Sequence, residues 1–395
     1  MAYRKNAKPS DTEMEMTLDS GIEISAEMPE DEAMTDEQLQ NIVMGEIDDA
    51  QAYIDDIISP LRAEAGQYYK GEPFGNEEEG RSQVVSMDVR DTVQAIMPSI
   101  MRVFFGSSSV VEFAPNGPED VANAEQATDY VNYCLTRDNN LFFHAYAMFK
   151  DALVRKNGFG KVWWDEKETV KTYEIEGLDE NAYSVLMSDP TVELREVEVE
   201  YGEMEAMTPE GIATVIQMPT YSATVVRKTK EGRLNMQALP PEELLIDRRA
   251  KSINDFEFIG HRRYLTVSEL VQMGYEQDEV EQLGFETQDD FEGNQEAFDR
   301  NPQATILGAG RTDTASKKVL YIEGYIYVDM DGDGIAELQK VCVGGSAYKL
   351  LHNEAVDDHP FFDFCPDPEP HTFFGMSIAD VVMDIQRIKS SIMRN

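Results

Sequence analysis

The hydrophobic pattern of this chain changes at Asn157-Gly158. Before this point, apolar residues recur at three- and four-residue steps, which is the period of a helix buried on one face. After it, several stretches are rich in Thr, Val and Tyr and alternate partly between apolar and polar residues, which is typical of strands: 169–176, 192–204, 214–228 and 232–238. The sequence therefore predicts an α+β protein whose helices come first and whose strands follow.

Four helices are expected in the first part of the chain. The first runs from Asp36 to about Leu61, where Pro60 stops or kinks it, and a loop at 68–76 follows. The others are expected over 85–105 with a kink at Pro98, from Pro118 onward, and over 141–155.

The second part mixes strands with short helices. A strand is expected at 160–164, a helix at 266–274, a mobile acidic loop at 276–315, and a hairpin of strands at 318–328 and 336–343. Ser377 and Asp380 form a capping box that opens an apolar-striped helix. That helix reaches Asn395 without a glycine, a proline or a cap, which suggests a sequence cut inside a longer one.

The charge balance argues against a protein that grips nucleic acid. Among 395 residues, 76 are acidic and 34 are basic, whereas binding to phosphates needs clustered Lys and Arg. An acidic wall nevertheless lets a polyanion slide past without sticking. No run approaches the ~18 apolar residues of a membrane span, no secretory signal begins the chain, and three cysteines without a CxxC pair favour a reducing compartment.

The most specific local motif runs from Asp329 to Glu337. Carboxylates at its first, third and fifth positions, followed by a glycine, match the first half of an EF-hand calcium loop. Lys340 stands where that loop needs a glutamate, and the flanks are predicted strands, so an Asp-Gly hairpin turn is the alternative. The candidate calcium ligands are Asp329, Asp331, Asp333 and Glu337.

Other candidate chemistry is weak. Lys161 follows two glycines but lacks the spacing of a phosphate-binding loop, so a helix-to-strand turn explains it better. His359, Cys365 and His371 are not spaced like paired zinc ligands, and neither GxSxG nor HExxH occurs. Aromatic pairs such as Phe104-Phe105 lack interleaved basic residues, so packing is expected of them. The protein is therefore predicted not to be an enzyme, and no cofactor other than a possible calcium ion is expected.

Several stretches, in this order, resemble the portal proteins (head-to-tail connectors) of tailed, podovirus-type bacteriophages. They are Tyr68–Gly71, Arg81–Ser86, Arg102–Gly106, Asn139-Asn140, Leu153–Val162, Leu239–Asp247, Asp255-Phe256, Gly260–Arg262, Gly274-Tyr275, Asp329–Glu337, Phe374–Ser377, Asp380 and Asp384–Lys389. Each motif is loose, but together they cover roughly residues 65–395. The very acidic first forty residues depart from the family pattern, and portals of this kind usually continue past the last helix.

The resemblance implies a ring subunit with wing, stem, clip and crown regions, arranged with identical copies, as a dodecamer, around a channel for double-stranded DNA at a capsid vertex of the virion. The implied partners are the terminase large subunit, a scaffold protein, the major capsid protein and tail-adaptor proteins, with assembly in the host cytoplasm and no membrane.

The expected organisation follows from the pattern and the resemblance together. It comprises a flexible acidic N-terminal arm (1–40), a helical wing region (41–165), a β-rich region (166–265), a mixed region with the acidic loop and the aspartate hairpin (266–372), and the start of a long helix (373–395). A calcium-binding structural module built on Asp329–Glu337 is the alternative function.

Overall fold

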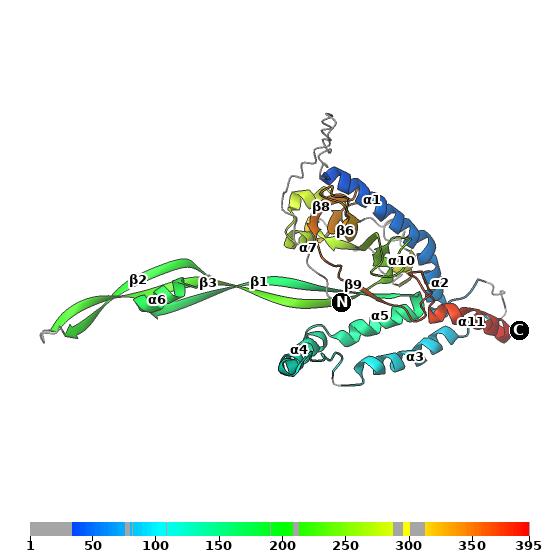
Figure 1. The fold of residues 1–395 in the computed structure, drawn as a ribbon, viewed down its shortest axis with the longest axis horizontal. Coiled ribbons are helices and arrows are strands. Elements are labelled where there is room, and N and C mark those ends of the chain that lie inside the picture. Colours follow the sequence, from blue (N-terminus) through cyan, green and yellow to red (C-terminus); the bar gives the residue numbers. More distant parts are fainter. Residues whose placement is uncertain are drawn as a thin grey trace, which may run out of the picture.

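The computed structural model describes residues 34–75, 80, 82–107, 109–189, 191–207, 213–286, 295–300 and 313–394. It is a mixed α+β chain with a body of helices and sheet, from which a long β-structure projects to one side (Figure 1). Residues 1–33, most of the predicted N-terminal arm, lie outside the described residues.

A long helical rod opens the fold. It consists of α1 (Asp36–Ala52), a π-helical stretch η1 (Tyr53–Ile58) and α2 (Ser59–Lys70). The prediction that the helix ends near Leu61, with a loop from Tyr68, is wrong. Pro60 lacks an N–H and its ring would clash with the carbonyl four residues earlier, and the wider π turn, in which Ser59 N–H bonds Ile54 O, accommodates it.

The main core lies between this rod and an antiparallel five-stranded sheet of order β4-β5-β6-β7-β8. The buried stripe of α1, including Leu39, Val43 and Ile47, packs on strands rich in buried Ile, Val and Phe. The strands are β4 (Leu244–Ile246), β5 (Phe258–Thr266), β6 (Lys318–Val328), β7 (Glu337–Gly344) and β8 (Lys349–Ala355). The predicted β6–β7 hairpin is confirmed, and β4, β5 and β8 were not predicted.

A second helical layer lies below the sheet in Figure 1. It holds α3 (Asp88–Phe105), η2 (Pro118–Asp120), α4 (Val121–Tyr133), η3 (Cys134–Asp138), α5 (Leu141–Arg155) and α11 (Ile378–Arg394). The predicted helices over 85–105 and 141–155 and the one opened by Pro118 are confirmed, and α3 continues through Pro98. In the Ser377–Asp380 capping box, Asp380 N–H donates to Ser377 Oγ and Ser377 N–H donates to Asp380 Oδ2.

The projecting part is an antiparallel sheet of order β2-β3-β1-β9. Its strands are β1 (Gly158–Leu178), β2 (Val192–Met207), β3 (Ala213–Leu239) and β9 (Phe361–Phe364), and α6 (Glu180–Met187) packs on it. Because β9 pairs only with residues 158–161, the remainder extends beyond the body as a β-arm, defined here as residues 162–236 (Figure 1). The separate strands predicted at 160–164 and 169–176 are one strand, and so are those at 214–228 and 232–238.

Short elements complete the body: η4 (Pro241–Glu243), α7 (Val267–Gln272), α8 (Gln277–Glu281), α10 (Gln295–Arg300) and η5 (Thr314–Ser316). Helix α7 lies within the helix predicted at 266–274, and Thr266 opens it with a capping box. The prediction of a mobile loop over 276–315 is wrong at α8 and α10, which pack on the body; residues 287–294 and 301–312 lie outside the described residues. Among the described residues, no helix has both the length and the apolar character needed to cross a membrane.

Candidate functional site

Helix α11 buries two polar side chains, Gln386 and Ser390, and exposes four aliphatic ones. Gln386 and Ser390 are completely buried, with 0% exposure. Gln386 Oε1 accepts from Val89 N–H at 2.9 Å, and Gln386 Nε2 donates to Tyr68 O at 2.9 Å. Ser390 Oγ accepts from Ser86 N–H at 2.9 Å. Gln386 thus binds Val89 N–H, which the first turn of α3 leaves unpaired, and adds a second donor to Tyr68 O, which also accepts from Gly71 N–H at 3.1 Å.

The outward face of α11 carries an aliphatic stripe, defined here as Val381, Ile385, Ile388 and Ile392. These side chains are 53%, 60%, 62% and 70% exposed. Their four-, three- and four-residue spacing is that of a helix seam that packs against another element. The sequence predicted this stripe but gave no indication that it faces outward.

The outer part of the β-arm has two chemically different faces, because side chains alternate across a strand. On one face, Tyr173, Val225 and Leu194 align across the three strands, next to Ile175, Ala223 and Val197. Helix α6 packs on this face and stacks Tyr183 on Tyr221 with ring centroids 4.6 Å apart. The other face is acidic and hydroxylated; it carries Glu174, Thr224, Glu196, Ser222 and Glu198.

A buried ion pair fixes the root of the β-arm to the five-stranded sheet. Lys161 Nζ lies 2.6 Å from Glu323 Oε2, and Tyr325 Oη donates to Glu323 Oε1 at 2.8 Å. Burial lowers the pKa of Lys161, although Glu323 opposes the shift. Burial also opposes ionisation of Glu323, but the charge and hydrogen bonds of Lys161 outweigh it and lower the pKa of Glu323. Lys161 is thus a structural residue of β1, in agreement with its rejection as a phosphate-binding lysine.

A cluster of buried charges holds α10 against α2, α5 and η4. Glu296 Oε1 lies 2.8 Å from Arg155 Nη1, and its Oε2 lies 3.7 Å from Arg62 Nη1. Arg300 forms two hydrogen bonds of 2.9 Å with Glu242 and reaches Asp151 at 3.1 Å. Burial raises the pKa of Glu296 and lowers that of Arg62 despite their opposite charges. Sequence reasoning missed this cluster because its members are far apart along the chain.

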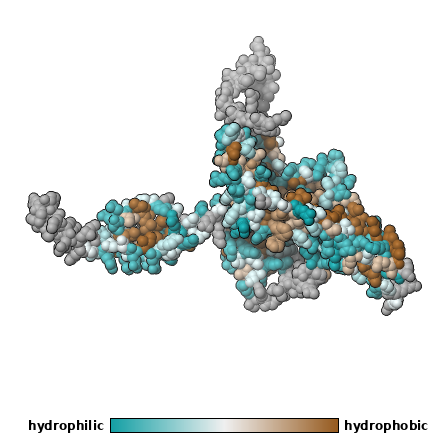
Figure 2. Space-filling model, turned by 90° about the horizontal axis from the view of Figure 1, so that it is seen from below, coloured by the Kyte–Doolittle hydropathy of each residue, from teal (hydrophilic) through white to brown (hydrophobic). Residues whose placement is uncertain are grey.

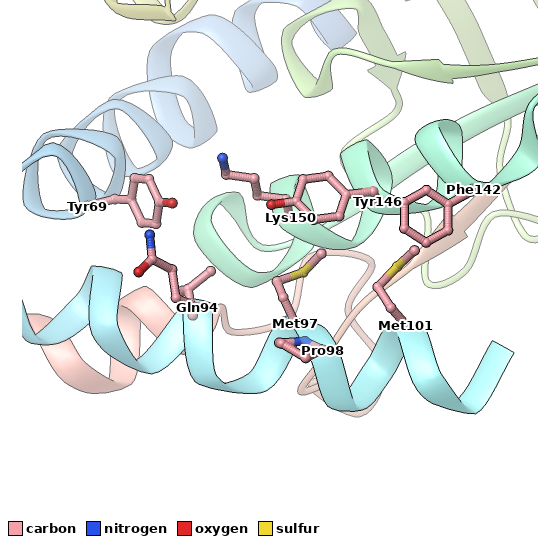
Figure 3. A pocket seen from close by; sticks show the side chains of 9 residues that line it. Tyr69, Gln94, Met97, Pro98, Met101, Phe142, Tyr146 and Lys150 are labelled. Atoms are coloured by element: carbon pink, nitrogen blue, oxygen red, sulfur yellow. The ribbon is translucent and has the colours of Figure 1, made fainter. Parts of the chain in front are cut away.

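A pocket of about 300 Å³ lies between α3 and α5 (Figure 3). Met97, Met101 and Phe142 line its apolar end, and Tyr69, Gln94 and Lys150 line the opposite end. Lys150 Nζ lies 5.4 Å from the centre of the Tyr69 ring, in cation–π geometry. A cavity of this size means that the two helices pack incompletely along this seam.

The aspartate motif forms the turn between β6 and β7. Within the described residues, Asp329, Asp331 and Asp333 form the group whose carboxylates approach one another closely enough, within 4.8 Å, to hold a metal ion. Glu337 is not part of it and begins β7. Asp329 accepts hydrogen bonds from Gly332 N–H and Gly334 N–H at 2.8 and 2.7 Å, and both glycines have positive φ. The hairpin turn thus has the predicted geometry, and calcium binding stays a prediction.

The aromatic pairs contribute to packing, as expected. Phe373 is buried and stacks on Phe159 with centroids 6.0 Å apart, and Phe104 contacts Phe149 at 5.0 Å.

The model of the phage SU10 portal protein family matches residues 39–395, which is nearly the whole chain. The chain belongs to this portal family. The resemblance inferred from local motifs is thereby confirmed, and portal proteins are structural components of phage particles. A search of curated proteins found no match for the chain. For a portal-family chain, the relevant sites are surfaces that can contact other subunits, namely the aliphatic stripe of α11 and the faces of the β-arm.

Proposed function

We propose that this portal-family chain assembles with identical copies into a closed ring, a dodecamer, at one vertex of a phage capsid. The ring is the channel through which double-stranded DNA enters during packaging and leaves during ejection. The terminase large subunit docks on it during packaging, the scaffold and major capsid proteins surround it, and tail-adaptor proteins bind it later. The helical region forms the wing, the β-rich regions form wing and clip parts, and assembly takes place in the host cytoplasm.

The observation that carries this proposal is the exposed aliphatic stripe of α11. A lone globular subunit usually buries its isoleucines, whereas Ile385, Ile388 and Ile392 are at least 60% exposed. An exposed aliphatic stripe on an ordered helix indicates a surface that packs against a further segment of the protein or against another molecule. In a family of phage portal proteins, the natural cover is a second subunit.

The charge of the chain supports the role of a channel wall. With 76 acidic and 34 basic residues, the chain presents few cations that could hold DNA phosphates. Duplex DNA can therefore pass without strong, salt-dependent binding. No sequence preference is expected, since reading bases requires side chains that enter a groove.

The test is assembly of the intact gene product. Negative-stain microscopy and mass photometry are expected to show rings with an axial hole, and the rings are expected to bind the terminase large subunit in co-sedimentation. The double variant Ile385→Ser/Ile388→Ser should assemble poorly, whereas the control Ile335→Ser, in the exposed β6–β7 turn, should assemble normally. A protein that stays monomeric at all concentrations would refute the proposal.

A calcium-binding structural role for the β6–β7 turn is kept as the second proposal. The observation that favours it is the convergence of Asp329, Asp331 and Asp333, since hard carboxylate oxygens on a tight turn are the ligands that calcium prefers. Glu337 takes no part in this reduced version of the site.

A further inference from the structure

We propose that the outer end of the β-arm of one copy docks on the aliphatic stripe of α11 in a neighbouring copy. The outer end is defined as residues 171–189, 191–202 and 219–227, which include α6. The inference rests on the proposed ring and deepens it, because it names the two surfaces that meet between subunits.

The two surfaces lie at opposite sides of the subunit. The β-arm projects from one side of the body, and α11 lies at the opposite side (Figure 1). Figure 2 shows an apolar patch over the α6 part of the β-arm and apolar surface at the opposite end, where α11 lies. The two patches cannot meet within one copy in this structure. A head-to-tail ring needs two different complementary surfaces on each subunit, and these satisfy that requirement.

Both surfaces contain apolar side chains that the described residues leave exposed. On the β-arm, Val185 is 73%, Tyr201 is 68% and Tyr173 is 46% exposed. On α11, the four stripe residues are at least half exposed. Aromatic side chains such as Tyr201 anchor interfaces because they bury a large area with few rotatable bonds.

The two surfaces also carry opposite net charges. The outer end of the β-arm has nine acidic and three basic residues, and one of the three, Arg227, already pairs with Asp189 at 3.4 Å. Residues 385–394 of α11 have three basic residues and no acidic ones. Of these, Arg387 and Lys389 are exposed next to the stripe, although Lys389 also contacts Asp88 at 2.6 Å. This half-helix has a net positive charge, although the exposed Asp384 directly precedes it, and an acidic partner would suit it.

The edges of the β-arm argue for docking through side chains instead of strand pairing. Strand β2 is an open edge, and Glu196, Glu198 and Glu200 alternate with Val197, Val199 and Tyr201 along it. Charged edges discourage edge-to-edge pairing of sheets, because like charges would lie opposite each other. The apolar side chains of the same strand stay available for contact with a helix.

The first experiment crosslinks the two surfaces in the intact protein. Single variants Tyr201→Cys and Ile388→Cys are mixed and treated with a short bismaleimide. We expect covalent dimers from the mixture, and a ladder of higher oligomers when both substitutions are in one chain. There are two controls. One is the unsubstituted chain, in which Cys134 and Cys342 are buried and Cys365 is partly buried, and the other is the exposed pair Tyr201→Cys with Ile335→Cys. Neither control should give the ladder.

The second experiment exchanges charges across the interface. Arg387→Glu/Lys389→Glu should raise the protein concentration needed for half-assembly roughly tenfold, and mixing with Glu180→Lys, at the exposed start of α6, should restore part of the loss. Normal rings that give no Tyr201–Ile388 crosslink would overturn this inference and leave the proposed function intact. Crosslinking of Ile388→Cys to itself would also overturn it. Failure of the unmodified protein to form rings would overturn both.

Discussion

Replacing Glu296 with leucine is expected to destabilise the protein strongly, because two buried guanidinium groups then lose their shared carboxylate. Glu296 and Arg62 are both completely buried, and Arg155 is 6% exposed. Burial raises the pKa of Glu296 and lowers that of Arg62, so desolvation outweighs the attraction between them. Each of these buried charges is therefore stable in the fold only while its partner is present.

Removing one partner of a buried ion pair leaves the other charge buried without compensation. Such changes lower the free energy of unfolding by about 3–5 kcal/mol. Taking about 3 kcal/mol, at about 1.2 °C per kcal/mol for a chain of 395 residues, Tm should fall by roughly 4 °C. The double variant Arg62→Met/Glu296→Leu should recover part of this loss, because it removes two of the three desolvated charges and leaves Arg155 with Glu242 at 3.9 Å. About 1 kcal/mol should remain lost, since Pro241 O no longer accepts the 2.9 Å hydrogen bond from Arg62.

Thermal unfolding followed by circular dichroism measures the effect, and amide hydrogen exchange of α10 measures its location. Exchange in α10 should rise in Glu296→Leu before exchange in the five-stranded sheet does. Glu125→Leu, which removes an exposed carboxylate on α4, is the matched control and should leave Tm unchanged. If Glu296→Leu melts as the parent does, or if the double variant is less stable than the single one, the reasoning is refuted.

Three further predictions concern other sites. Gln386→Leu should lower stability by about 1–3 kcal/mol, because Val89 N–H stays buried without its acceptor, whereas Tyr68 O keeps its bond from Gly71 N–H; an unchanged denaturation midpoint would contradict it. Calcium should raise Tm, with an effect absent in Asp331→Asn, if the aspartate turn binds it; calorimetric titration without heat, together with an unchanged Tm, would remove the metal hypothesis. The depressed pKa of Glu323 means that its stabilisation is complete above the ordinary value of 4.5 and is lost as pH falls through the lower folded-state value. Glu323→Gln should therefore flatten the acid side of the stability–pH curve, and an equally steep curve would count against the pair with Lys161.

The sequence alone determined the local structure wherever a few neighbouring residues decide it. The capping box at Ser377, the helix over 141–155 and the glycine-containing turn between β6 and β7 depend on bonds within a few residues, and all were predictable. The order of motifs also sufficed for the portal resemblance. Pro60 misled the prediction because a proline rule treats the α-helix as the only option, whereas a π turn let the helix continue.

Only the tertiary structure decided which faces are covered. Periodicity shows that Val381, Ile385 and Ile388 share one side of a helix, but not that Gln386 and Ser390 turn inward to bind backbone groups some 300 residues away in the sequence. In the same way, Glu296 lies in a segment that composition alone assigns to a loop, and partners from α2 and α5 make it part of the core. The physical reason is that burial depends on contacts between distant segments, which local patterns do not encode.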